Sequence, residues 1–416
     1  MSHKYSGFEV TAVAIAAGAL TFLASGCGGG GSGGTVTGPP PPLAANVVSV
    51  IVDGGPAGTV GVVNTPYVSV TVCAHGTSSC QTIDHITVDT ASTGLRIISS
   101  VLSTTVAAAL GQVLDAQSNP LVECTNFADG YSWGPVKVAD VQIGGEQASS
   151  VPIQVIGDPA FSTVPSDCTS LGRQEDTVAD FGGNGILGIA VFKEDCGPGC
   201  VTKTFSHGPY YDCPPNGGCV VTTATLASQV ANPVALFATA DHNGTILELP
   251  TVGAAGAGTL TGSLIFGIDT ESNNALGMAT VLTVDSIGDF STMFNNQTLP
   301  NSFIDSGSNA YFFPDGSTTV CTSAVASGFY CPSATQSLTA TITSASAISK
   351  DVSFTVANAD ALFNGQPSFT VFGNLAGTNS DPASFDFGLP FFMGRHVYTA
   401  IEGETTSAGM GPFVAF

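Results

Sequence analysis

The stretch from His85 to Ile98 reads H-I-T-V-D-T-A-S-T-G-L-R-I-I, and residues 301–313 repeat its plan as N-S-F-I-D-S-G-S-N-A-Y-F-F. Each copy is an apolar strand that ends in Asp, followed by a hydroxyl residue, a small residue and Ser, and then by a second apolar strand. A single Asp-Ser-Gly is common in turns. Two copies, centred on Asp89 and Asp305 with enough chain between them for one lobe, predict a two-lobed site.

This pattern suits two carboxyl groups that share one proton. Two carboxylates about 3 Å apart cannot both ionise cheaply, so one keeps its proton while the other accepts one from a water molecule. Asp89 and Asp305 are the candidate pair. Small residues allow the backbone to approach each carboxylate, and the hydroxyls of Ser92 and Ser308 can donate hydrogen bonds to the ionised form.

The chain resembles the pepsin-like (A1-type) aspartic peptidases, and it is most similar to an uncharacterised family of bacterial lipoproteins with that fold. In the peptidases each lobe supplies Asp-Thr/Ser-Gly-Ser/Thr and, later, two apolar residues and Gly. The corresponding landmarks occur here in the same order, as Asp89-Thr90-Ala91-Ser92, Ile186-Leu187-Gly188, Asp305-Ser306-Gly307-Ser308 and Phe387-Gly388. The resemblance covers most of residues 60–416 and implies an all-β, bilobal fold with few short helices, with lobes at 44–272 and 273–416.

The resemblance also implies roles for individual residues. Asp89 and Asp305 would be the catalytic pair, one taking a proton from water while the other protonates the carbonyl oxygen of a peptide bond, with no covalent intermediate. Thr90 and Ser306 would brace the two loops against each other, and Gly307 would allow close approach. A polypeptide would occupy the cleft between the lobes, and neither a metal nor an organic cofactor is implied.

One residue departs from the family pattern. Where the peptidases have Gly after Asp-Thr, this chain has Ala91. If the position requires a positive φ or a very close backbone approach, the methyl group would displace the loop and disturb the carboxylate pair. The sequence therefore predicts the fold more firmly than the activity.

Composition favours an all-β protein with many turns. Of the 416 residues, 43% are hydrophobic and 9% charged, and Gly is abundant, which is typical of strands joined by many turns. The net charge of −23 reflects only eight Lys and Arg against 31 Asp and Glu. Such a surface would repel nucleic acid, which we exclude as a partner. We expect a monomer.

The first 43 residues read as a targeting segment and a tether. An apolar run at residues 10–23 precedes L-A-S-G-C, which resembles a bacterial lipobox with Cys27 as the lipidated residue. An ordinary secretory signal is the alternative. Gly28 after Cys27 resembles outer-membrane sorting, so we expect an exported cell-envelope lipoprotein. Residues 28–43 are rich in Gly and Pro and predict a tether without a core.

Ten further cysteines are predicted to form disulfides, because their number is even and the chain is exported. The pairs Cys73 with Cys80 and Cys321 with Cys331 are local enough to predict. The other six cysteines can pair in several ways. Residues 196–219 could instead bind zinc, although the spacings C-x3-C and C-x5-C and an oxidising compartment disfavour this alternative.

Residues 124–145 predict a hairpin with its turn at Asp129-Gly130. In the peptidases a hairpin flap bearing Tyr closes over the substrate. Phe127 falls nearest the flap Tyr position, with Tyr131 and Trp133 as alternatives, and simple packing of the hairpin is an equally open interpretation.

Rival functions have weaker support in the sequence. The histidines show no metal-binding spacing, and no Ser-His-Asp site is indicated. The main alternative is a pepsin-fold lipoprotein that binds a peptide, a glycan or an envelope protein without cleaving it. A β-rich adhesive or structural surface protein is a more distant alternative.

Overall fold

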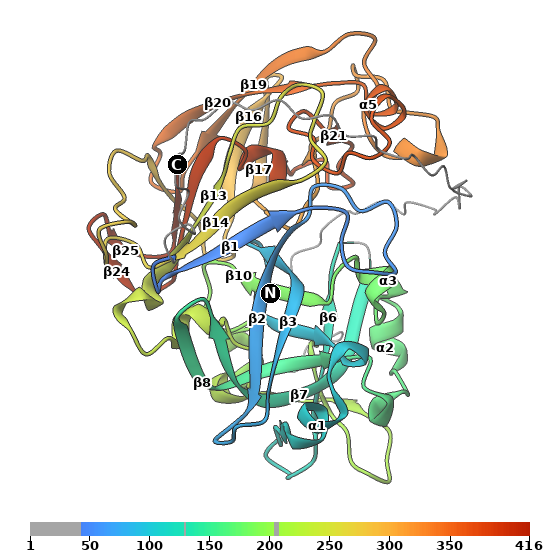
Figure 1. Cartoon of the computed structure of the whole chain (residues 1–416), viewed down its shortest axis with the longest axis vertical. Helices are drawn as coiled ribbons and strands as arrows, with labels where there is room; N and C mark the ends of the chain where they lie inside the picture. Colours follow the sequence, from blue (N-terminus) through green and yellow to red (C-terminus); the bar gives the residue numbers. More distant parts are fainter. Residues whose placement is uncertain (1–42, 129, 204–207) are drawn as a thin grey trace, which may run out of the picture.

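Figure 1 shows the computed structural model of the chain, which describes residues 43–128, 130–203 and 208–416. Strands dominate these residues, and the longest α-helix, α5 (Ala359–Gly365), has 7 residues. The blue-to-green and orange-to-red parts of the chain occupy opposite halves of the view. The predicted all-β, bilobal fold class with few short helices is therefore confirmed. Cys27 and residues 28–42 of the predicted tether lie outside the described residues.

The described strands form two large sheets and one small one. The 17-stranded sheet contains β1 (Val47–Val52), β2 (Pro66–Ala74), β3 (Cys80–Asp89), β4 (Thr93–Ile98), β5 (Gly111–Gln112), β6 (Leu121–Asn126), β7 (Gly130–Ile143), β8 (Glu146–Ile156), β9 (Arg173–Gln174), β10 (Gly185–Ile189), β11 (Tyr210–Asp212), β12 (Val220–Val221), β13 (Gly244–Leu249), β14 (Leu260–Phe266), β15 (Val281–Thr283), β23 (Arg395–Ala400) and β26 (Phe413–Ala415). The 7-stranded sheet contains β16 (Phe290–Phe294), β17 (Gln297–Ile304), β18 (Tyr311–Phe312), β19 (Gln336–Thr343), β20 (Ser349–Val356), β21 (Ala376–Gly377) and β22 (Asp386–Phe387). The small sheet pairs β24 (Thr405–Thr406) with β25 (Gly409–Met410).

Helical segments are short connections between strands. The remaining α-helices are α1 (Thr104–Ala109), α2 (Ser166–Thr169), α3 (Val178–Phe181) and α4 (Pro198–Thr202). Single 3-10 turns are Ser99–Val101, Pro159–Phe161, Leu226–Ser228, Pro233–Leu236, Ala240–Asn243, Ala324–Ala326 and Leu389–Phe391. Helix α1 begins where the Ser103 side chain accepts a hydrogen bond from the Val106 amide, as expected for an N-cap serine.

Strand burial follows the position of each strand in the sheets. Strand β20 alternates exposed and buried residues, as expected for a strand with one face in water. Strands β4 and β10 are buried along their whole length, because they lie in the interior of the larger sheet, and their sequences are correspondingly apolar except at Thr93 and Arg96. The described core is continuous between the two halves of the chain.

The two halves of the chain share one sheet. Strand β23 pairs with β13, and β26 pairs with both β15 and β23, so the C-terminal segment joins strands that precede residue 290. Figure 1 shows β1, β13 and β14 crossing between the two halves. The division at residues 272 and 273 stays a prediction. The shared sheet fixes the two halves against each other beside the cleft described below.

Five disulfides link all ten cysteines of the described part of the chain. Cys73–Cys80 and Cys321–Cys331 match the two predicted pairs. The pairs left open are Cys124–Cys168, Cys196–Cys200 and Cys213–Cys219. Since Cys196, Cys200, Cys213 and Cys219 are bonded to one another in two pairs, they do not supply the zinc ligands considered as an alternative. Five disulfides indicate an exported protein. No helix in residues 43–128, 130–203 and 208–416 is long and apolar enough to span a membrane.

Candidate active site

Strand pairing places Asp89 at the end of β3. Strand β10 runs parallel to β3, with Gly188 opposite Asp89, and antiparallel to β4. A Cβ atom added to Gly188 would lie 2.7 Å from the backbone carbon of Ser92, so only glycine fits between these strands. We call residues 89–92 the Asp89 loop. The predicted landmark Ile186-Leu187-Gly188 therefore packs against this loop, between the two strands that flank it.

The second lobe repeats this arrangement around Asp305, which directly follows β17. Strand β22 runs parallel to β17, with Phe387 opposite Ile304, and antiparallel to β18. At Gly388 an added Cβ atom would lie 2.1 Å from the Ala310 carbonyl oxygen, so glycine is again required. Residues 305–308, the Asp305 loop, thus sit on the same kind of support as the Asp89 loop.

Four buried hydrogen bonds join the two loops. The Thr90 amide donates to Ser306 Oγ at 3.1 Å, and the Ser306 amide donates to Thr90 Oγ1 at 3.0 Å. Each hydroxyl then donates to the strand of the other lobe, Thr90 Oγ1 to the Ile304 carbonyl at 3.1 Å and Ser306 Oγ to the Val88 carbonyl at 2.7 Å. These four reciprocal hydrogen bonds, which we call the reciprocal hydrogen-bond lattice, hold Asp89 and Asp305 side by side.

Removing the Thr90 hydroxyl is expected to weaken this lattice measurably. In Thr90→Val the Ser306 amide and the Ile304 carbonyl lose their buried partner, so the free energy of unfolding should fall by about 2 kcal/mol. The matched control is Thr82→Val, which removes an exposed Thr71–Thr82 hydroxyl contact of 2.7 Å and should cost less than about 0.5 kcal/mol. Denaturant unfolding of both variants checks this, and equal losses would contradict it.

The two carboxyl groups receive different hydrogen bonds. Asp89 Oδ1 accepts from the amides of Ala91 and Ser92 at 2.8 and 3.1 Å. Asp305 Oδ1 accepts from the Gly307 amide at 2.7 Å, and Asp305 Oδ2 accepts from the Ser308 hydroxyl at 2.8 Å. The hydroxyl of Ser308 therefore does what the sequence suggested. The Ser92 hydroxyl does not, because its buried Oγ has no hydrogen-bond partner among the described residues.

The geometry around Ala91 answers one of the concerns raised by the sequence. Ala91 is not among the residues with positive φ, so its methyl group does not strain the backbone. Close approach does matter at the corresponding position of the other loop, where a Cβ atom added to Gly307 would lie 3.0 Å from Asp89 Cγ and 3.1 Å from Asp305 Oδ1. The Ala91 amide nevertheless reaches Asp89 as the Gly307 amide reaches Asp305.

Burial and like charge control the protonation of this site. Asp89 and Asp305 are 6% and 4% exposed. Burial, the nearby Asp89 carboxylate and the charge of Asp386 hold the pKa of Asp305 well above its usual range. Burial likewise raises the pKa of Asp386 well above its usual range. The pair can therefore keep a shared proton, as an acid and base acting together must. Asp386 was not singled out from the sequence.

Buried carboxyl groups should make the protein most stable in mild acid. Burial also raises the pKa of Asp289 to about 7, against about 3.9 for Asp in an unfolded chain. Folded protein thus holds protons that the unfolded chain has released. The stability from this linkage is complete below about pH 4 and disappears as the pH rises through the folded value near 7.

We expect the free energy of unfolding to fall between about pH 4 and pH 8. In Asp289→Asn this fall should be shallower, because one of the tightly held protons is gone. Denaturant unfolding at a series of pH values measures both curves. Stability that rises over this range would show that the buried carboxyl groups do not control it.

A cleft lies over the two loops and receives residues from both halves of the chain. Its lining includes the aromatic residues Phe127, Phe181, Phe312 and Phe329 and the carboxylates Asp89, Glu175, Asp180 and Asp305. No Lys, Arg or His is among the described residues that line it. The cleft is therefore lined by apolar and acidic side chains.

The hairpin predicted at residues 124–145 forms from β6 and β7, which pair antiparallel with Asn126 opposite Tyr131. Phe127 at its tip lines the cleft and contacts Phe181 edge to face, with ring centroids 5.6 Å apart. Tyr131 and Trp133 are buried in the core beneath the hairpin, where Trp133 Nε1 donates to the Phe161 carbonyl at 2.7 Å. Only Phe127 of the three lines the cleft.

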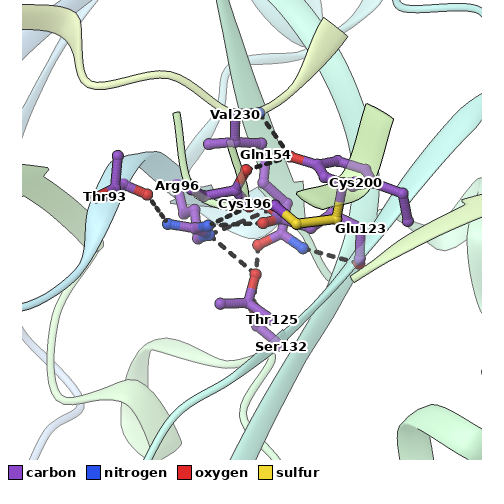
Figure 2. Close-up of polar contacts among 11 residues, drawn as sticks. Thr93, Arg96, Glu123, Thr125, Ser132, Gln154, Cys196, Cys200 and Val230 are labelled. Atoms are coloured by element: carbon purple, nitrogen blue, oxygen red, sulfur yellow. Dashed lines mark hydrogen bonds and ion pairs between the residues drawn. A yellow bond between two sulfur atoms is a disulfide. The ribbon is translucent and has the colours of Figure 1, made fainter. Parts of the chain in front are cut away.

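A buried ionic network supports the strand that follows the Asp89 loop. Figure 2 shows Arg96 of β4 surrounded by polar groups from several segments. Its Nη1 donates to the Thr93 carbonyl at 2.7 Å, and its Nη2 lies 2.6 Å from Glu123 Oε1 and 3.3 Å from Asp195 Oδ2. The Tyr210 hydroxyl donates to Asp195 Oδ1 at 2.6 Å. Burial and the neighbouring Glu123 raise the pKa of Asp195 well above its usual range.

Comparison with known proteins gives a family and a likeness to solved structures. The family described as "Protein of unknown function (DUF3443)" matches residues 42–416. No curated protein sequence matches the chain. Among solved structures, the aspartic proteinase from Irpex lacteus is similar, with a TM-score of 0.48 and 16% sequence identity over 89% of this chain and 97% of that one.

Proposed function

This chain belongs to the family described as a protein of unknown function, DUF3443, and we propose that it is an aspartic endopeptidase that hydrolyses peptide bonds with Asp89 and Asp305. The observation that carries the proposal is the reciprocal hydrogen-bond lattice of Thr90 and Ser306, which brings two buried carboxyl groups together at the floor of one cleft. Neither a metal nor a nucleophilic side chain is needed for this chemistry.

In the proposed reaction a water molecule lies between the two carboxyl groups. One carboxylate takes a proton from the water as the other carboxyl group protonates the carbonyl oxygen of the scissile bond, and a proton then passes to the leaving nitrogen. Which residue starts ionised is a property of the coupled pair rather than of either group. The Ser308 hydroxyl, which donates to Asp305 Oδ2, favours the ionised form of that carboxyl group.

A second candidate function is the binding of a polypeptide without cleavage. It is favoured by Ala91, because the corresponding Gly307 has no room for a Cβ atom without close contact to both carboxyl groups. A methyl group in the opposite loop would occupy space that the reacting water needs. The occupant of the cleft is a polypeptide in both candidates, so turnover is what separates them.

The first test is incubation of the purified protein with an unfolded protein substrate in mild acid, with new termini identified by mass spectrometry. We expect cleavage beside apolar residues, and we expect a peptide mimic carrying a hydroxyl group at the scissile position to abolish it, because such a mimic resembles the tetrahedral transition state. Tight binding of the mimic without cleavage at any pH would favour the binding function and make Ala91→Gly the next variant.

For location, we propose a lipoprotein of the bacterial cell envelope, anchored through Cys27 and sorted to the outer membrane. The lipobox-like sequence before Cys27 and the five disulfides support this proposal. Mass spectrometry of the mature N-terminus tests it directly. A diacylglyceryl group on Cys27 is expected, and an unmodified N-terminus after signal cleavage would contradict it.

A further inference from the structure

Asp386 is a buried carboxyl group close to the candidate dyad. It lies on β22, opposite Phe303 of β17 and Phe312 of β18, and it is 4% exposed. Its chain neighbours Phe385 and Phe387 are buried and stack with their ring centroids 4.2 Å apart. Burying a carboxyl group is costly unless other groups compensate.

The polar atoms of Asp386 are only partly satisfied. Its Oδ1 atom is buried without a hydrogen-bond partner among the described residues. Such unsatisfied atoms are rare in folded proteins, and each calls for a physical explanation. A structural role alone does not explain this atom, because an apolar residue at this position would be buried without the cost of desolvating a carboxyl group.

Ser308 connects Asp386 to the candidate dyad. The Ser308 hydroxyl donates to Asp305 Oδ2 at 2.8 Å, and it also interacts with the Asp386 carboxyl group, lowering the pKa that burial has raised. The charges act in both directions, since Asp386 raises the pKa of Asp305 and Asp89 raises that of Asp386. The charge of Asp386 therefore bears directly on the protonation of Asp305.

The first lobe lacks this arrangement and serves as an internal comparison. Ile186 pairs with Thr87 of β3 just as Asp386 pairs with Phe303 of β17, so the corresponding position is apolar. The hydroxyl of Ser92, which corresponds to Ser308, has no hydrogen-bond partner in the part of the chain that the structure describes. The acid and the engaged hydroxyl thus occur together, and only in the second lobe of the described chain.

From this geometry we infer that Asp386 is a positioning residue of the site, which acts through its charge so that Asp89 and Asp305 keep their shared proton to a higher pH. The inference rests on the proposed function for its catalytic consequence. The ionisable groups that act on Asp386 are Asp89, at the end of β3, and Asp305, at the end of β17. Its partners on β17 and β18, Phe303 and Phe312, carry no charge.

The catalytic test is the pH profile of kcat/KM for the full chain and for Asp386→Asn, which keeps the shape and a hydrogen-bonding amide. An ionised Asp386 opposes loss of the shared proton. Removing it should shift the alkaline limb of the profile down by about one pH unit. The acid limb should stay in place, because Asp386 is protonated there.

Asp289→Asn is the matched control. It also removes a buried carboxyl group of high pKa from the second lobe, but Asp289 responds to Asp285 and Asp381 rather than to the dyad. Its pH profile should coincide with that of the unaltered protein. An alkaline limb that is unchanged in Asp386→Asn, or shifted equally in both variants, would overturn the inference.

A direct titration makes the inference independent of turnover. In the full chain labelled with ¹³C at the Asp carboxyl carbons, Asp386→Asn should remove one resonance of high pKa and move a second, belonging to the dyad, to titrate at lower pH. Asp386→Ile, which copies Ile186, should move the same resonance. If the dyad resonance shifts in this way but the protein cleaves no peptide, the proposed function is rejected and the inference about Asp386 stands. A dyad resonance that stays in place would overturn the inference whether or not the protein is active.

Discussion

Asp89→Asn and Asp305→Asn are each expected to lower kcat/KM by about a thousandfold or more, since general acid and base catalysis by positioned groups contributes about 10²- to 10⁴-fold. An Asn can neither take a proton from water nor give one to a carbonyl oxygen. Because the two groups work as one unit, the double variant should be no slower than the worse single variant. Initial rates on a defined peptide measure all three variants.

Loss of activity in these variants should not come with loss of stability. Asp89 and Asp305 are like charges in a buried site, and replacing one of them removes their repulsion. We therefore expect the free energy of unfolding of Asp305→Asn at neutral pH to be unchanged or higher. If the variant is inactive and its free energy of unfolding is also lower, the carboxyl group is needed for folding rather than for catalysis.

Arg96→Met is expected to lower the free energy of unfolding by about 3–5 kcal/mol, the cost of leaving a buried charge without its partner. The guanidinium is the cation between Glu123 and Asp195, and the side chains of Arg96 and Glu123 are 2% and 0% exposed. Methionine fills much of the same space, so the lost unfolding free energy comes mainly from the missing charge and less from a change in side-chain volume. The deficit should grow from pH 4 to pH 7, as the stranded carboxyl groups are forced to ionise.

Lys193→Met is the control for this effect. Lys193 Nζ lies 2.5 Å from Glu404 Oε1, but both side chains are partly exposed, so the pair should contribute at most about 1 kcal/mol. Denaturant unfolding of both variants at two pH values compares them. Adding Glu123→Gln and Asp195→Asn to Arg96→Met should restore much of the lost stability. If Arg96→Met loses no more unfolding free energy than Lys193→Met, the buried ionic network does not stabilise the fold as proposed.

Local patterns in the sequence were enough to predict the two Asp loops. Asp89 and Asp305 each follow an apolar strand and precede a small residue and Ser, so residues adjacent in sequence define most of each loop. The glycines at 188 and 388 were placed by the resemblance to the pepsin-like peptidases, and the structure leaves no room for a Cβ atom at either position. The local disulfides Cys73–Cys80 and Cys321–Cys331 follow the same logic of short separation.

Features that depend on pairing between distant strands could not be predicted. Asp386 stands in the apolar run F-D-F-G, and only the pairing of β22 with β17 brings it to the dyad. A single acidic residue inside such an apolar run indicates a buried carboxyl group. In the same way, Arg96 within G-L-R-I-I indicates a buried cation. Neither run identifies the partner. The hairpin aromatics were ambiguous for a related reason, since the sequence does not say which of them faces the cleft.

The central claim, that Asp89 and Asp305 share one proton during catalysis, is tested most directly by the pH dependence of kcat/KM on a defined peptide from about pH 2 to pH 8. We predict a bell-shaped profile with its maximum in acid, because the active form of the pair holds one proton and both limbs belong to the pair. A rate that keeps rising toward neutral pH would contradict the shared-proton dyad.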